Sequence, residues 1–153
     1  MFSGRMTAVL VAAGAILRDF LSAFGISVGS YTSRIGSVVD TASYSAEEIL
    51  ARSTTNALRA MTPELEDAMR CEILSAKADG DSVGGVIRCV ATGLPAGLGE
   101  PFFDTLDGEI AKAVFAVPGV KGIEFGAGFA ASAMRGSENN DSYRMADDAV
   151  RTE

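Results

Sequence analysis

The sequence predicts an α+β fold with four helices and three strands in the order α-β-α-α-β-α-β. In four segments apolar residues recur at steps of three and four, the spacing of one helix face. Three other segments are short and rich in β-branched residues, which favours strands. With 153 residues, of which 48% are apolar, the chain has the size of one domain with a packed core.

The first helix is predicted over residues 6–24, whose apolar side chains form one stripe. Ser3 can cap its start and Gly25 can end it. The continuous apolar run, residues 6–17, is shorter than the ~20 residues of a membrane-spanning helix. This run therefore favours a core helix over a signal peptide. A short strand over residues 26–31 should follow.

Two further helices and a strand are predicted in the middle of the chain. Residues 45–48 (SAEE) have the pattern of a capping box, which starts a helix that should run to about residue 60. Pro63 suits the first position of a third helix, and Gly80 should end that helix. Residues 83–90 are rich in β-branched residues and predict a strand.

The last third contains a loop at 93–101, a helix at 104–115 that Asp104 can cap, and a strand at 120–125. From residue 133 the chain is polar, so we expect a core segment at 1–132 and a flexible tail at 133–153. Three strands rarely make a self-sufficient sheet. Strands from a partner chain, or from sequence outside this chain, should therefore cover its edges.

Charge and composition exclude several classes of function. The net charge of −7 without basic clusters does not suit nucleic acid, so we expect an acidic, soluble, cytoplasmic protein that binds neither nucleic acid nor membrane. The sequence has no histidine, which excludes Ser-His and Cys-His nucleophile pairs and imidazole-ligated zinc. Cys71 and Cys89 lie in apolar patterns and are expected to be buried thiols, with no metal site.

Two glycine-containing segments have both a functional and a structural interpretation. Ser3, Gly4 and Arg5 at a helix start could bind a phosphate or carboxylate, or could form a plain cap beside a solvated arginine. Residues 80–85 could be mistaken for a phosphate-binding loop, but they follow a helix and precede a strand. That order is the reverse of a nucleotide-binding motif, so a tight turn is favoured.

Several segments together resemble chorismate synthases, and the likeness extends over residues 2–141. Each motif alone is weak, whereas their shared order and spacing are specific. The matching runs are residues 2–8 (FSGRMTA), 11–16 (VAAGAI), 80–85, 83–101 with GLGEP at its end, 103–107, 111–113, 117–126 (VPGVKGIEFG), 128–129, 135–138 (RGSE) and 140–141.

The resemblance implies part of a β-α-β sandwich, with helices packed on a mainly antiparallel sheet. The family eliminates phosphate and a ring proton from 5-enolpyruvylshikimate 3-phosphate to give chorismate. This reaction belongs to the shikimate pathway of aromatic amino acid biosynthesis and needs reduced FMN. The resemblance thus implies a cytoplasmic lyase with a small phosphorylated substrate. Family members are homotetramers, so it also implies a homo-oligomer.

Site residues follow from the resemblance at matching positions only. Phe2 and Ser3 align with FMN contacts of the family, and Pro118 and Gly119 align with a loop that touches the flavin. Gly4 and Arg5 align with substrate-contacting positions, where Arg5 should pair with a carboxylate or phosphate.

The match leaves out the family's N-terminal Gly-Glu-Ser-His-Gly motif, its catalytic histidines and its C-terminal third. Asn139 stands where the family usually has histidine, Val9 where many members have proline, and Met1 where many have histidine or arginine. We therefore assign no catalytic residue and expect the isolated chain to be inactive. The alternative is a non-catalytic truncated relative that acts as an oligomerisation module or as a flavin- or phosphate-binding module.

Overall fold

The computed structural model describes residues 4–52, 55–146 and 149–152, which divide into two compact units. The first unit spans residues 8–96 and holds helices α1 (Thr7–Ser22), α2 (Ala46–Arg52) and α3 (Pro63–Ala78) and a three-stranded sheet. The first residue of α1, Thr7, is assigned to the second unit. The second unit comprises residues 4–7 and 97–152.

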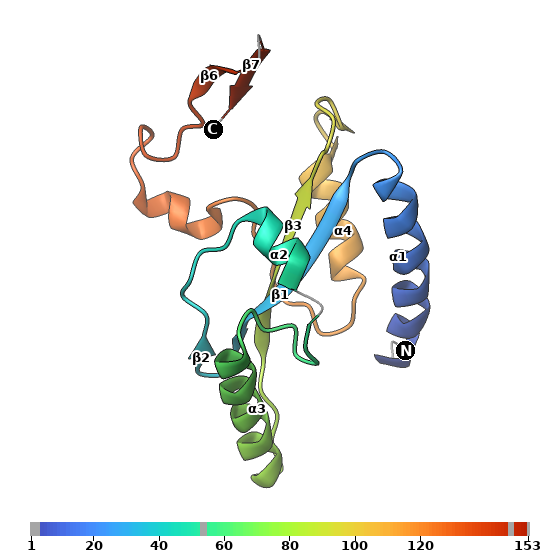
Figure 1. Ribbon diagram of the computed structural model, residues 1–153, viewed down its shortest axis with the longest axis vertical. Coiled ribbons are helices and arrows are strands. Elements are labelled where there is room, and N and C mark those ends of the chain that lie inside the picture. Colours follow the sequence, from blue (N-terminus) through green and yellow to red (C-terminus); the bar gives the residue numbers. More distant parts are fainter. Residues whose placement is uncertain (1–3, 53–54, 147–148, 153) are drawn as a thin grey trace. The chain divides into compact units, whose positions relative to one another are not determined.

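The sheet of the first unit is antiparallel throughout, which confirms the predicted fold class. It contains β1 (Ser27–Ile35), β2 (Val38–Val39) and β3 (Gly85–Thr92) in the spatial order β2-β1-β3 (Figure 1). Tyr31 pairs with Arg88 in the β1–β3 register. The register shifts between Thr32 and Arg34, where one strand carries an extra residue.

Helix α2 lies against β1 and β3, and α3 lies beside β1 and β2 (Figure 1). The close approach of α2 requires a glycine below it, because a Cβ on Gly29 would lie 3.0 Å from Leu50 Cδ2. The core of the unit is small. Its buried apolar residues are Tyr31, Ile49, Ala60, Met61 and Met69, with Tyr44 and Val90 packed at the margin.

The predicted start signals of the second and third helices are confirmed. Ser45 and Glu48 form a reciprocal capping box, with the Glu48 N–H donating to Ser45 Oγ at 3.2 Å and the Ser45 N–H donating to Glu48 Oε2 at 2.9 Å. Thr62 caps α3 by accepting a bond from the N–H of Leu65, and Pro63 occupies the first turn.

Both glycines expected to end a helix adopt positive φ, 76° at Gly25 and 70° at Gly80. After α1, the N–H of Ile26 donates to the carbonyl of Leu21 at 3.1 Å. After α3, the N–H of Asp81 donates to the carbonyl of Ala76 at 2.8 Å. These bonds have the six-to-one spacing of the Schellman motif, which glycine favours because the left-handed conformation is strained for other residues.

The predicted end of the second helix is wrong. This helix was expected to run to about residue 60, but α2 ends at Arg52. Residues 55–60 instead form a loop in which Asn56 replaces helical hydrogen bonds. Its side chain donates to the carbonyl of Ala60 at 2.7 Å and accepts from the N–H of Ala60 at 3.0 Å. Thr32 in β1 holds the same loop by bonding to the carbonyls of Leu58 and Arg59. Such side-chain bonds compete with helix formation.

The second unit contains short elements and one longer helix. They are the 3-10 turn η1 (Gly4–Met6), β4 (Gly99–Glu100), β5 (Asp104–Thr105), α4 (Leu106–Phe115), the 3-10 helix η2 (Gly128–Ala133), β6 (Tyr143–Ala146) and β7 (Ala149–Thr152). Strands β4 and β5 pair with each other and contact α4, and β6 pairs with β7.

Two predictions for this unit are wrong. Thr105, not Asp104, is the N-cap residue of α4, because Asp104 pairs with Glu100 in the β4–β5 ladder. The strand expected at 120–125 is absent from the described residues, since this stretch has no neighbouring strand with which to pair. The boundary proposed at residue 132 stays a prediction.

The prediction that the two cysteines are buried is also wrong, because Cys71 in α3 and Cys89 in β3 are both exposed. Cys71 lies about 200° around α3 from the buried Met69, so it falls on the other side of the helix. Burial around Cys89 is nevertheless sufficient to raise the pKa of its thiol. Incomplete coverage of apolar faces recurs along the first unit.

Candidate functional site

The predicted anion-binding group lies at the start of α1. Gly4 and Arg5 form the turn η1 together with Met6, and the Thr7 hydroxyl closes it by donating a 2.5 Å hydrogen bond to the carbonyl of Gly4. The Arg5 residue is exposed. The first N–H groups of a helix have no intrahelical acceptor, and the helix dipole is positive at this end. This position therefore offers an anion both a guanidinium and N–H donors.

Pro118 and Gly119 lie in an exposed turn after α4. Gly119 has a φ of 93°, and a Cβ placed there would meet no atom within 4 Å. Its backbone is thus open to a ligand. The same compact unit holds this turn together with Gly4 and Arg5. Phe2 and Ser3 lie outside the described residues.

These residues fit an anionic group better than they fit acid–base chemistry. The guanidinium of Arg5, the helix start and the open turn at Gly119 are suited to bind phosphate or carboxylate oxygens. A proton donor that titrates near neutral pH is not among them, because the sequence contains no histidine. The arrangement therefore suits an anionic ligand and offers no imidazole for proton transfer.

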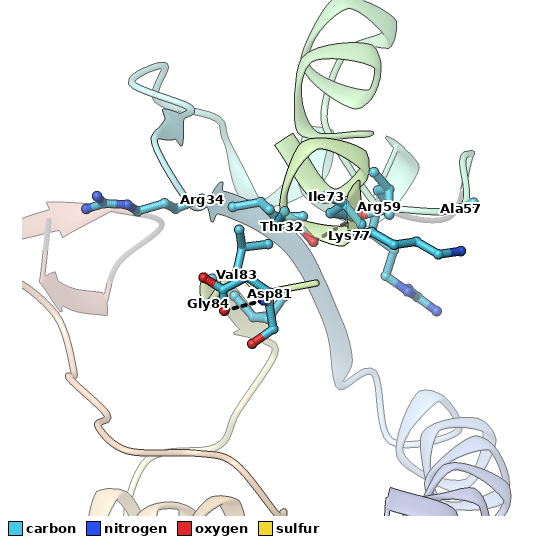
Figure 2. A pocket seen from close by; sticks show the side chains of 15 residues that line it. Thr32, Arg34, Ala57, Arg59, Ile73, Lys77, Asp81, Val83 and Gly84 are labelled. Carbon is cyan, nitrogen blue, oxygen red and sulfur yellow. Dashed lines mark hydrogen bonds between the residues drawn. The ribbon is translucent and has the colours of Figure 1, made fainter. Parts of the chain in front are cut away.

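The first unit contains a second feature, a cavity of ≈ 690 Å³ between the end of α3 and the β1–β3 sheet (Figure 2). Its walls come from β1, the loop at residues 57–59, the end of α3 and the turn before β3. Figure 2 shows Arg59 and Lys77 extending to one side of the cavity, while Arg34 extends to the other. The volume falls in the range of small-molecule pockets, about 300–1,000 Å³.

The cavity is cationic on an acidic protein. Among the described residues, Arg34, Arg59 and Lys77 line it together with one acidic residue, Asp81, whereas the whole chain has a net charge of −7. Sequence reasoning missed this cavity because its cations come from three separate segments. Of the tight turn predicted at residues 80–85, the structure has the turn at Asp79 and Gly80 that ends α3. Residues 81–84 join it to β3 without a further turn, and the Ser82 N–H donates to Asp81 Oδ1 at 2.7 Å.

A buried carboxyl group lies beside the core. Asp40 is 5% exposed, and its Oδ1 accepts bonds from the Ala42 N–H at 3.0 Å and from the Tyr44 hydroxyl at 3.2 Å. Its Oδ2 has no hydrogen-bond partner among the described residues. Burial, followed by the hydrogen bond to Asp40 and the charge of Asp40, raises the pKa of Tyr44. Tyr44 also packs edge-on against Tyr31, with ring centroids 5.5 Å apart.

Carboxylates at helix starts have lowered pKa values, for structural reasons. The Ser45 N–H lowers the pKa of Glu48, and the Glu64 backbone N–H lowers that of Glu64. A hydrogen bond from the Thr105 side chain lowers the pKa of Asp107. These bonds favour the charged forms at helix N-termini. They stabilise helices and give no sign of catalysis.

Within residues 4–52, 55–146 and 149–152, no three cysteine, aspartate or glutamate side chains lie close enough together to hold a metal ion. Among the helices of this part of the chain, none combines the length and apolar character needed to cross a membrane.

Comparison with known proteins gives one consistent family. The family model described as chorismate synthase matches residues 1–152. A chorismate synthase from Dehalococcoides mccartyi is 47% identical over 99% of this chain, and one from Korarchaeum cryptofilum is 42% identical over 98% of it. This chain spans 41% of the length of each of these relatives.

A solved structure agrees with the sequence comparisons. A crystal structure of chorismate synthase superposes with a TM-score of 0.89 and 31% sequence identity. The match covers 98% of this chain and 48% of the solved chain. The fold expected from the resemblance is thereby confirmed. Because the family match extends over nearly every residue, the chain belongs to the chorismate synthase family.

Proposed function

We propose that this chain forms part of a chorismate synthase active site, in an assembly that eliminates phosphate from 5-enolpyruvylshikimate 3-phosphate with reduced FMN. The observation that carries the proposal is the position of Arg5, exposed at the start of α1 within a family match over residues 1–152. An arginine at a helix N-terminus suits a substrate with phosphate and carboxylate groups.

The proposed site residues divide between substrate and cofactor. Arg5 binds an anionic group of the substrate, and Gly4 leaves room for the substrate to approach the backbone. Pro118 and Gly119 contact the flavin through their backbone. Phe2 and Ser3, which lie outside the described residues, are assigned to FMN by the family resemblance alone. Reduced FMN, when bound, supplies the electron density that helps phosphate to leave.

The chain's own residues do not supply the proton transfers, because the sequence has no histidine. The isolated chain should therefore form no chorismate. In this proposal the catalytic groups belong to the part of the family fold that is not matched here, and the assembled enzyme is a homo-oligomer in the cytoplasm.

The test is a hybrid enzyme in which this chain replaces the matching segment of the Dehalococcoides mccartyi chorismate synthase, which is 47% identical. We expect the hybrid to form chorismate with reduced FMN under anaerobic conditions. Arg5→Ala should lower kcat/KM by about 100-fold or more, as expected for the loss of a charge-assisted contact worth ~3 kcal/mol. Arg18→Ala is the matched control, because Arg18 is an exposed arginine in α1, the helix that follows the turn with Arg5.

An active hybrid that loses no activity with Arg5→Ala contradicts the role of Arg5. A hybrid that folds but forms no chorismate contradicts the proposed function itself. Chorismate formation by the isolated chain contradicts the claim that its catalytic groups come from elsewhere.

The alternative is a non-catalytic module for oligomerisation or for flavin or phosphate binding. The exposed apolar surface of α1 favours association. Light scattering tests association, and a monodisperse monomer counts against it. Calorimetric titration tests the binding of FMN. A dissociation constant below about 10 μM, worth roughly −7 kcal/mol, would support a binding module.

A further inference from the structure

The walls of the cavity in the first unit are largely apolar. They carry the large apolar side chains Ile35, Leu58, Ile73, Val83 and Ile87. Every lining residue falls between positions 32 and 87, within one compact unit, so the shape of the cavity does not depend on where the second unit lies. Walls of this kind suit a ligand with an apolar body, because hydroxyl groups placed against them would lose their hydrogen bonds to water.

Two cations stand together on one side of this cavity. Figure 2 shows Arg59 and Lys77 extending to the same side, away from Arg34. Lys77 is exposed and makes no ion pair with a described residue. A guanidinium has five N–H donors, so Arg59 can bind a ligand while it is also bonded within the protein. This side of the cavity therefore attracts an anionic group.

The backbone at Arg59 is strained in a way that keeps its side chain at the cavity. Its φ is 54°, a left-handed value that is unfavourable for any residue with a Cβ and that glycine adopts freely. Thr32 in β1 holds the loop in place by donating its N–H to the Arg59 carbonyl at 3.0 Å and its hydroxyl to the Leu58 carbonyl at 2.7 Å. Residues held in strained conformations by surrounding bonds concentrate at functional sites.

Apolar walls beside a cationic side define the chemistry of a ligand. An inorganic anion would leave the apolar walls in contact with water, and a neutral apolar molecule would leave the cations without a partner. We propose that this cavity binds a small carboxylate with an apolar body, whose carboxylate contacts Arg59 and Lys77 and whose body lies against Ile73, Val83 and Ile87. None of these residues is assigned to substrate or flavin, so the inference goes beyond the proposed function.

The experiment uses hydrocinnamate, a phenyl ring on a short chain that ends in a carboxylate. Hydrocinnamyl alcohol has the same apolar body without the charge. Calorimetric titration measures both dissociation constants for this chain and for the hybrid enzyme. We expect hydrocinnamate to bind both proteins with a dissociation constant below about 1 mM and at least ~10-fold more tightly than the alcohol, as a charge-assisted contact implies. Weaker binding of hydrocinnamate, or equal binding of the alcohol, overturns the proposal.

Substitutions of exposed residues locate the contact. Lys77→Gln should weaken hydrocinnamate binding by about 10-fold, and Lys77→Arg, which keeps the charge, should retain most of it. Ile87→Ala removes part of the apolar wall, where Ile87 is 60% exposed, and should weaken binding by about 3-fold. Lys112→Gln is the matched control, because Lys112 is an exposed lysine in the second unit. Equal effects of Lys77→Gln and Lys112→Gln overturn the location.

The same titrations separate this proposal from the proposed function, because they do not measure turnover. Arg5→Ala should leave hydrocinnamate binding unchanged. Loss of binding in Arg5→Ala would place the ligand at the start of α1 and overturn the proposal. Binding by this chain that the hybrid lacks would mean that the rest of the fold fills the cavity, and it would overturn the proposal as well.

Discussion

The hydrogen bond between Tyr44 and Asp40 should contribute measurably to the stability of the first unit. The Tyr44 hydroxyl donates to Asp40 Oδ1 at 3.2 Å, and Asp40 is 5% exposed, so water cannot readily replace the lost donor. Tyr44→Phe removes this donor and keeps the edge-on contact with Tyr31. We expect the free energy of unfolding to fall by about 1–3 kcal/mol, the range for a hydrogen bond to a buried polar group.

Asp40→Asn provides the second half of the test. An amide oxygen in place of Oδ1 can still accept from Tyr44 and from the Ala42 N–H, and the amide nitrogen replaces Oδ2, which has no partner among the described residues. Asp40→Asn removes the desolvation cost of a buried charge but places a buried N–H donor group where Oδ2 stood. Because these two effects oppose each other, stability should change by less than about 1 kcal/mol.

Urea denaturation of the wild type, Tyr44→Phe, Asp40→Asn and the double variant measures the change in stability caused by each substitution. Tyr143→Phe is the control for the loss of a tyrosine hydroxyl, because Tyr143 is 79% exposed. If Tyr44→Phe and Tyr143→Phe change stability equally, the buried hydrogen bond contributes nothing and the reasoning is refuted. The raised pKa of Tyr44 also predicts how stability depends on pH. The contribution of neutral Tyr44 to the free energy of unfolding is fully present below the unfolded pKa of about 10, and it is lost as the pH rises through the folded pKa.

Three further predictions concern single residues. Ser45→Ala removes the hydroxyl that accepts from the Glu48 N–H and should lower stability by about 1 kcal/mol in urea denaturation. The N–H of residue 45 that lowers the pKa of Glu48 belongs to the backbone and remains in the variant, so in both proteins the contribution of Glu48 should be present above its unfolded pKa and lost as acid protonates it. Gly80→Ala places a side chain at a φ of 70° and should cost about 1 kcal/mol or more, read from the midpoint of urea unfolding. Cys89 should react with a thiol reagent at pH 8 more slowly than Cys71, since burial raises the pKa of the Cys89 thiol and lowers its thiolate fraction; single serine variants assign the two rates, and a faster Cys89 would contradict this cause.

Local signals in the sequence located most helix ends. The SAEE run at 45–48, Pro63, Gly25 and Gly80 each act through atoms within five residues of themselves, so their effects are visible in sequence. The segment after Arg52 was mispredicted because Asn56 and Thr32 satisfy the backbone there, and Thr32 is more than twenty residues away in sequence.

Burial could not be predicted from apolar patterns alone. Cys71 and Cys89 lie in apolar stretches of the sequence and are exposed, and no residue of the apolar helix α1 is buried. Whether they are covered depends on partners that a pattern does not name. The strand predicted at residues 120–125 was wrong for a related reason. A strand requires a neighbouring strand, and the apolar alternation in this segment does not indicate which segment would pair with it.

The candidate site was predicted unevenly. Gly4 and Arg5 were singled out by helix-start chemistry, while Pro118 and Gly119 came from the family resemblance and remain proposals. The cationic cavity was not predicted at all. Its side chains Arg59 and Lys77 come together through the loop after α2 and the end of α3, which is tertiary information.

Turnover by the isolated chain and by the hybrid enzyme tests the central claim most directly. Both are purified free of host chorismate synthase and assayed for chorismate under anaerobic conditions with reduced FMN and 5-enolpyruvylshikimate 3-phosphate. The account predicts chorismate from the hybrid and none above background from the isolated chain, whose sequence lacks histidine. Chorismate formed by the isolated chain at a rate comparable to the hybrid would contradict it.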